Sequence, residues 1–254
     1  MTSRLAIILA ILLIACGSAV AQAPASAPGV GGILPDVQTP AGFSVALRWL
    51  AIITVLSLAP AIIVMVTSFT RIVVVLGLLR QALATQQLPP NQVLFGLAVL
   101  MTLVVMAPVY TDIHNEAIRP YLDGAVDQQT ALAAGEKHVR AFCIKQIEAA
   151  GNTADVYPFL PDELAANDGL KWSDVPTLSM IPAFVVSELK VAFLMGFRIF
   201  LPFLVIDMLV ASVLVSMGML MLPPVLISLP FKLLLFVLAD GWHLVIGTLM
   251  QSFN

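Results

Sequence analysis

The sequence predicts an all-α membrane protein with two apolar helical hairpins, whose helices are kinked or broken, and a small helical insert outside the cytoplasm. Hydrophobic residues make up 60% of the 254 residues and charged residues only 11%, whereas a soluble domain carries roughly 25% charged residues. Mean hydropathy is +1.00. Several uncharged stretches also reach the roughly 20 residues that a helix needs to cross a bilayer.

Charge and cysteine content exclude other classes of protein. The formal net charge of −3 gives nucleic acid no basic surface to bind. Two cysteines, Cys16 and Cys143, are too few for a Cys-rich metal site or a disulfide framework.

Residues 1–21 have the layout of a secretory signal peptide, with Arg4 before an apolar run and a small-residue site that ends at Ala21. Cleavage there would place the mature N-terminus outside the cytoplasm. The residues that end at Cys16 also resemble a lipobox, so acylation of Cys16 is the alternative, and N-terminal sequencing would decide. Residues 22–43 are rich in proline, glycine and alanine, which predicts a linker.

Residues 44–110 are predicted to form the first apolar hairpin. Two uncharged stretches, 49–70 and 92–110, are each long enough to span a bilayer. The charges between them are all basic, at Arg71 and Arg80. The positive-inside rule therefore places the connection in the cytoplasm.

Residues 111–180 are predicted to form a water-facing periplasmic insert. Acids outnumber bases there by eleven to five, and apolar residues at helical spacing predict an amphipathic helix around 128–150. Its histidines and carboxylates show neither the spacing of metal ligands nor a pair of acids placed for catalysis. A solvated face explains these charges best.

Residues 181–254 are predicted to form the second apolar region. Charges at membrane depth are costly and need a partner or water. Glu188 and Lys190 are two residues apart and point to different sides of a helix, so neither can serve the other. Each needs a partner elsewhere, for which Lys232 and Asp240 are candidates. Snorkelling from a helix end is an equal alternative for Arg198 and Asp207.

An uncharged stretch at 208–231 contains the pair Pro223-Pro224. Two prolines remove two backbone donors and clash with the preceding turn, so the helix is expected to stop or bend near Leu222. Methionines crowd the break, and methionine repacks easily when a gap changes shape. These side chains fit either ordinary core packing or a deformable plug in a pore.

Six motifs in order resemble the FliP family of flagellar biosynthesis proteins, which belongs to the type III export apparatus. They cover most of the two apolar regions and lie at residues 68–72 (SFTRI), 88–92 (LPPNQ), 181–190 (IPAFVVSELK), 200–207 (FLPFLVID), 216–224 (SMGMLMLPP) and 228–238 (SLPFKLLLFVL).

The resemblance implies a core subunit of the flagellar export gate, located in the bacterial inner membrane at the basal body. Family members form a pentamer that joins FliQ and FliR in a helical assembly, and unfolded flagellar subunits pass through its lumen. FlhA, FlhB and basal-body components are further partners that the resemblance implies. It implies no cofactor, no metal and no nucleic-acid partner.

The resemblance also assigns roles to residues. A methionine loop seals the closed pore, and in this sequence its positions are Met217, Gly218, Met219, Leu220, Met221, Pro223 and Pro224. Leu220 departs from the run of three methionines that is common in the family, which keeps the volume but stiffens the seal. An inter-subunit ion pair is implied between Glu188 and Lys232. The other buried charges are Lys190, Arg198, Asp207 and Asp240.

Three alternative functions stay open beside the flagellar gate. The first is the corresponding subunit of an injectisome. The second is a solute or ion transporter, which also uses broken helices and intramembrane charges, although no convincing internal repeat is present. The third is an assembly scaffold without a pore. An enzyme is not expected, because no nucleophile–base arrangement, phosphate loop or metal motif occurs.

Overall fold

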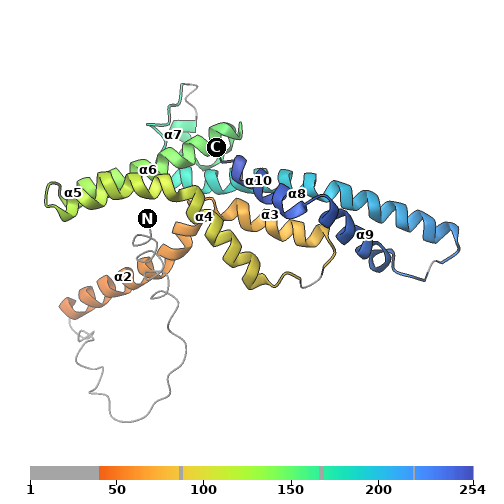
Figure 1. Ribbon diagram of the computed structural model, residues 1–254. Coiled ribbons are helices and arrows are strands. Elements are labelled where there is room, and N and C mark those ends of the chain that lie inside the picture. The colour runs from red at the N-terminus through yellow and green to blue at the C-terminus, as the bar shows by residue number, and fades with distance from the viewer. Residues whose placement is uncertain (1–39, 86–87, 166–168, 220, 254) are drawn as a thin grey trace, which may run out of the picture. The chain divides into compact units, whose positions relative to one another are not determined.

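A computed structural model describes residues 40–85, 88–165, 169–219 and 221–253 (Figure 1). Over these ranges the chain forms helices and no strands, which agrees with the all-α prediction. The signal peptide, Cys16 and most of the 22–43 linker lie outside the described residues. Within these described ranges three helices are long and apolar enough to cross a membrane, and the bent pair of helices near the C-terminus would be a fourth span if it counts as one.

The chain divides into two units after Ser57. The described part of the first unit is the beginning of α2 (Pro40–Met65). This helix is apolar all round, and its most apolar window has no buried residue. A helix that is apolar on every side suits a lipid environment.

The second unit contains the hairpin of α3 (Phe69–Ala82) and α4 (Asn91–Ile113). The uncharged stretch 49–70 is divided between two helices, because α2 stops at Met65 and α3 begins at Phe69. There the Thr67 hydroxyl donates to the Val64 carbonyl at 2.9 Å, a local bond that competes with the helical ladder. Arg71 therefore lies on α3 and not in the connection between two spans.

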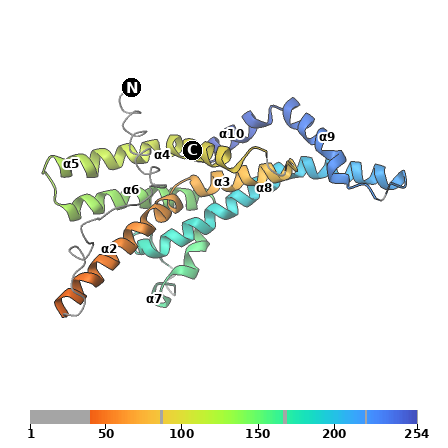
Figure 2. The ribbon, with the colours of Figure 1, turned by 90° about the horizontal axis from the view of Figure 1, so that it is seen from below.

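The acidic region begins without a break in the helix. After α4 the chain continues as the π-helix η2 (His114–Ile118) and then as α5 (Arg119–Leu122). The predicted amphipathic helix is confirmed as α6 (Gln128–Ala149), which lies beside η2 (Figure 2). Along α6 the apolar side chains of Phe142 and Ile147 are buried, whereas that of Leu132 is exposed. A 3-10 helix, η3 (Thr153–Phe159), and α7 (Asp162–Ala165) complete the insert.

The longest helix is α8 (Thr177–Ser216), with 40 residues. At 1.5 Å per residue it is about 60 Å long, twice the roughly 30 Å of hydrocarbon in a bilayer. Its first part packs against α6 and η3 of the insert, and α3 also runs along it (Figure 2). Only part of α8 can therefore lie in lipid.

The C-terminal region consists of α9 (Pro224–Leu238) and α10 (Gly241–Gln251), which meet at an angle of 64°. Asp240 stands at the bend in the left-handed conformation, with φ of 49°. Two apolar clusters stabilise the second unit. One joins α3, α4, α8, α9 and α10, and the other joins the insert to the start of α8.

Candidate functional site

The methionine loop connects α8 to α9. The helix ends at Ser216 and not near Leu222, because Gly218 adopts a φ of +74°. The amide of Met219 donates to the Leu214 carbonyl at 2.9 Å, and that of Gly218 donates to Val215 at 3.0 Å. These two bonds form a Schellman motif, the usual way in which a glycine ends a helix.

The two prolines act on the helix that follows. Pro223 stands at the N-cap of α9 and Pro224 is its first residue, a position where the missing amide proton costs nothing. The apolar stretch is therefore broken into two helices, as predicted, but Gly218 ends α8 and the two prolines begin α9.

The methionines of the loop are uncovered within the single chain. Met217 is 66% exposed, Met219 41% and Met221 98%. Leu220 lies outside the described residues. Three thioethers of an apolar loop are therefore free to contact another chain or lipid.

An ion pair lies on the helices that flank the loop. Lys232 of α9 is 2% exposed and donates to Asp207 of α8 at 2.6 Å and to the Ala82 carbonyl at 3.2 Å. The Ser228 hydroxyl donates to the other oxygen of Asp207 at 2.5 Å. These contacts hold α8 and α9 together against the end of α3.

A second buried ion pair joins Arg71 to Glu188. The Arg71 side chain is 2% exposed, and that of Glu188 is fully buried. Nε and Nη2 of Arg71 donate to the two oxygens of Glu188 at 2.7 and 2.5 Å. This bidentate geometry is the strongest form of a charge-assisted hydrogen bond.

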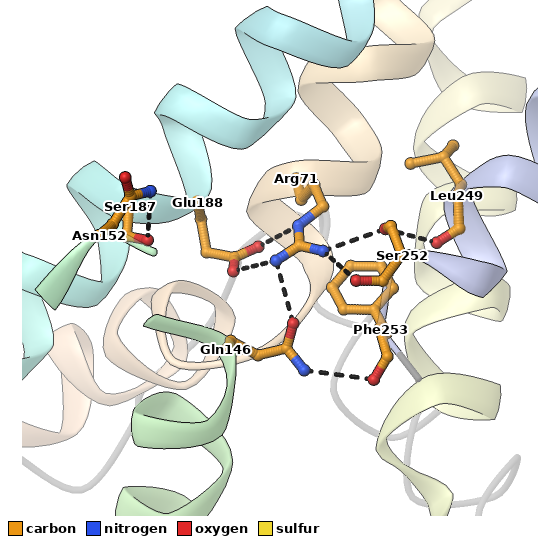
Figure 3. Close-up of polar contacts among 8 residues, drawn as sticks. All are labelled: Arg71, Gln146, Asn152, Ser187, Glu188, Leu249, Ser252 and Phe253. Carbon is orange, nitrogen blue, oxygen red and sulfur yellow. Dashed lines mark hydrogen bonds and ion pairs between the residues drawn. The ribbon is translucent and has the colours of Figure 1, made fainter. Parts of the chain in front are cut away.

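The remaining donors of Arg71 reach the insert and the C-terminus (Figure 3). Nη2 donates to Gln146 of α6 at 3.0 Å, and Nη1 donates to the carbonyl and hydroxyl oxygens of Ser252 at 2.7 and 3.0 Å. The Phe253 ring lies 4.1 Å from the guanidinium carbon, within cation–π range. Arg71 thus ties α3, α6, α8 and the chain end together.

Further bonds fasten the insert to α8. Asn152 donates to the Ser187 hydroxyl at 3.0 Å, and Lys190 forms an ion pair with Asp155. The partner predicted for Lys190 beyond the methionine loop is therefore replaced by one on η3. Arg198 and Asp240 are exposed, and their side chains make no hydrogen bond or ion pair with any residue that the structure describes.

Both charges of the predicted inter-subunit pair already have partners in their own chain, Arg71 for Glu188 and Asp207 for Lys232. Arg71 was not predicted as a site residue, because its charge fitted the connection between two spans. The motif SFTRI, which carries part of the family resemblance, includes Arg71 and could have marked it as a candidate site residue. A pairing of Glu188 with Lys232 between copies stays a prediction, and it requires an exchange of partners.

Burial also determines the state of Cys143 on α6, which is fully buried and unpaired. Desolvation, together with the negative charge of Glu188, raises the pKa of its thiol to about 12.

No three histidine, cysteine, aspartate or glutamate side chains lie close enough to hold a metal ion in the part of the chain that the structure describes.

Comparison with known proteins places the chain in a family. The sequence model of the FliP family matches residues 52–249. The flagellar biosynthetic protein FliP of Bacillus subtilis is 48% identical over 84% of this chain and 95% of its own length. The protein of the same name from Caulobacter vibrioides is 45% identical over 99% of this chain and 91% of its own length, and that from Aquifex aeolicus is 42% identical over 97% and 98%. The chain therefore belongs to the FliP family.

Proposed function

We propose that this protein is a membrane subunit of the flagellar protein export gate and that its methionine loop closes the export pore. The observation that carries the proposal is the exposed loop between α8 and α9, where three thioethers follow a glycine-capped helix end. Relatives that share over 40% of the sequence are named flagellar biosynthetic proteins, which supports a flagellar role.

In the gate, five copies of the chain form a pentamer, and this pentamer assembles with FliQ and FliR. A single chain leaves its apolar loop uncovered, and a ring of loops would surround a common axis with soft side chains. Methionine fills irregular space and repacks, so such a ring blocks small solutes when closed and yields to an unfolded polypeptide. FlhA, FlhB and basal-body components act beside it.

The exported N-terminus and the acidic insert lie in the periplasm in this proposal. The insert carries most of the acidic side chains of the chain. Its helices α6 and η3 pack on the first part of α8, and α8 as a whole is longer than a helix needs to be to cross lipid.

Leakage of small ions tests the function of the loop. Replacement of Met217, Met219 and Met221 by alanine is expected to make cells or proteoliposomes that contain the assembled gate permeable to small ions. Met208→Ala is the matched control, because Met208 is an exposed methionine of α8 outside the loop. A triple variant that assembles normally but stays tight would contradict a seal at this loop and favour a scaffold.

Motility tests the flagellar role itself. A strain that lacks its own FliP is expected to recover swimming and filament export when it expresses this chain together with the matching FliQ and FliR. Secretion of injectisome effectors without motility would identify the injectisome role instead.

A further inference from the structure

Two residues that follow α10, Ser252 and Phe253, lie against the buried Arg71 side chain (Figure 3). Nη1 of Arg71 donates to the carbonyl and hydroxyl oxygens of Ser252, and the Phe253 ring lies 4.1 Å from the guanidinium carbon. The Gln146 amide of α6 donates to the Phe253 carbonyl at 3.3 Å. We call Ser252 and Phe253 the C-terminal strap. The strap thus contacts α3 through Arg71 and the insert through Gln146.

The strap also forms part of the wall of a cavity of about 480 Å³. Gln146 and Phe253 line this cavity, and both also contact Arg71. The side chains of Arg71 and Glu188 are only 2% and 0% exposed. The Phe253 ring and the Gln146 amide therefore separate the ion pair from the cavity. Attraction between charges falls as water raises the local dielectric constant, so water that passed this wall would weaken the pair.

The strap is the part of this arrangement that opens most easily. The Ser252 hydroxyl donates to the Leu249 carbonyl at 2.8 Å, and the Phe253 amide donates to the Met250 carbonyl at a long 3.4 Å. Residues beyond the last turn of a helix open locally at low cost. Separation of the insert from α8, in contrast, exposes an apolar cluster that both elements share. Opening is therefore expected to begin at the strap.

We propose that the C-terminal strap is a conformational lock that holds the insert on α8. In the closed position it keeps water from the Arg71–Glu188 pair. In the open position the pair is hydrated and weakened, and the insert loosens from α8. Glu188 is fully buried while the strap is closed, so it can pair with another copy of the chain only after the strap opens. That last step rests on the proposed assembly, whereas the lock itself does not.

Labelling of Cys143 in the purified full-length protein tests the lock. Cys143 lies on α6, in the cluster between the insert and α8. Ser252→Ala with Phe253→Ala removes the hydroxyl bond to Arg71 and the ring over it. The rate of maleimide labelling at Cys143 is expected to rise at least about tenfold in the folded protein, the factor expected for loss of one hydrogen bond to a charged group.

Hydrogen exchange distinguishes release of the insert from general unfolding. Exchange in α6 should accelerate together with the labelling of Cys143 in the double variant. Exchange in α9 should stay unchanged, because Lys232 holds this helix through Asp207 and Ala82, which are not part of the strap. Equal acceleration in α6 and α9 would show that the strap contributes only to overall stability, and would overturn the proposal.

Two further variants keep the test decisive. Gln251→Ala changes the exposed last residue of α10 and should leave the labelling of Cys143 unchanged. Phe253→Leu retains an apolar side chain and should raise the labelling less than the double variant does. If circular dichroism shows that the double variant does not fold, Phe253→Leu should still exceed Gln251→Ala.

The lock and the proposed function fail in different experiments. Unchanged labelling of Cys143 in the folded strap variants, or an equal effect of Gln251→Ala, would overturn the lock. Both measurements concern contacts within one chain, so their outcome does not depend on whether the methionine loop closes a pore. The leakage and motility assays test that function separately.

Discussion

The Arg71 guanidinium and the Glu188 carboxylate form a bidentate ion pair, with N–O distances of 2.7 and 2.5 Å. The two residues are 117 positions apart in the sequence and lie on different helices. Gln146 and Ser252 take the remaining donors of Arg71. All five N–H groups of a guanidinium are thereby used. This pair is the point at which the membrane hairpin, the insert and the chain end meet.

Removal of Arg71 is expected to destabilise the protein strongly. Arg71→Met leaves the Glu188 carboxylate buried without a partner, which typically costs about 3–5 kcal/mol. Unfolding titrations in detergent measure this loss. The double variant Arg71→Met with Glu188→Met should recover a large part of it, because it leaves no unpaired charge.

The Lys190–Asp155 pair provides the control for that experiment. The Lys190 side chain is 55% exposed, and exposed ion pairs contribute about 1 kcal/mol or less. Lys190→Met should therefore have a small effect. If Lys190→Met lowers the stability as much as Arg71→Met does, burial does not explain the difference between the two ion pairs.

Charge reversal separates intramolecular from inter-subunit pairing. If Glu188 meets Lys232 of a neighbouring copy in the assembly, Glu188→Ala should lower the yield of oligomer several-fold. Glu188→Lys with Lys232→Glu should then restore part of it, as measured by size-exclusion chromatography with light scattering. If Arg71→Glu with Glu188→Arg restores the yield of oligomer and Glu188→Lys with Lys232→Glu does not, Glu188 pairs only within its own chain.

Gly218 should be the sensitive residue of the methionine loop, more than either proline. Its φ of +74° costs a residue with a side chain roughly 1 kcal/mol. Gly218→Ala should therefore lower the stability by about that amount and shift the end of α8, whereas Gly218→Asn should be milder. Hydrogen exchange at residues 213–219 measures the shift. Pro223→Ala should leave that end of α8 unchanged, and an equal effect of both variants would refute this account.

The Cys143 thiol should be unreactive while the protein is folded. Its pKa of about 12 leaves a thiolate fraction at pH 8 roughly a thousandfold below that of an ordinary cysteine, and the side chain is inaccessible. Maleimide labelling, read by mass spectrometry of the peptide that contains Cys143, should appear only on unfolding. A cysteine introduced at the exposed Ala133 of the same helix is the control, and comparable labelling of both thiols in the folded protein would be inconsistent with burial.

The first turn of α6 should loosen in acid. The Asp127 carboxylate accepts a hydrogen bond from the Thr130 amide at 3.1 Å. Hydrogen bonding to Thr130, side chain first and then backbone, lowers the pKa of Asp127 below its ordinary value of 3.8. A lowered pKa in the folded state stabilises the helix above pH 4 and ceases to do so as the pH falls through the folded pKa.

Amide exchange in the first turn of α6 follows this loosening. Asp127→Asn still caps the helix but does not titrate, so its exchange rates, corrected for intrinsic chemistry, should be independent of pH in this range. Identical acid dependence in both proteins would assign the loosening to other groups.

Local patterns in the sequence determined the helices of this protein. Hydropathy and length predicted an all-α chain with spanning helices, and helical spacing located α6. The break after α8 was attributed to the two prolines because they remove backbone donors, but Gly218, with its positive φ, ends the helix. The motifs also predicted the family, which the match of the FliP family to residues 52–249 confirms.

The tertiary structure alone decided which charges meet. Arg71 and Glu188, Lys232 and Asp207, and Lys190 and Asp155 each lie on different elements, and the period of a helix says nothing about which neighbour it faces. Burial of a charge depends on all the helices around it at once. The partners of these charges therefore appear only when the helices pack.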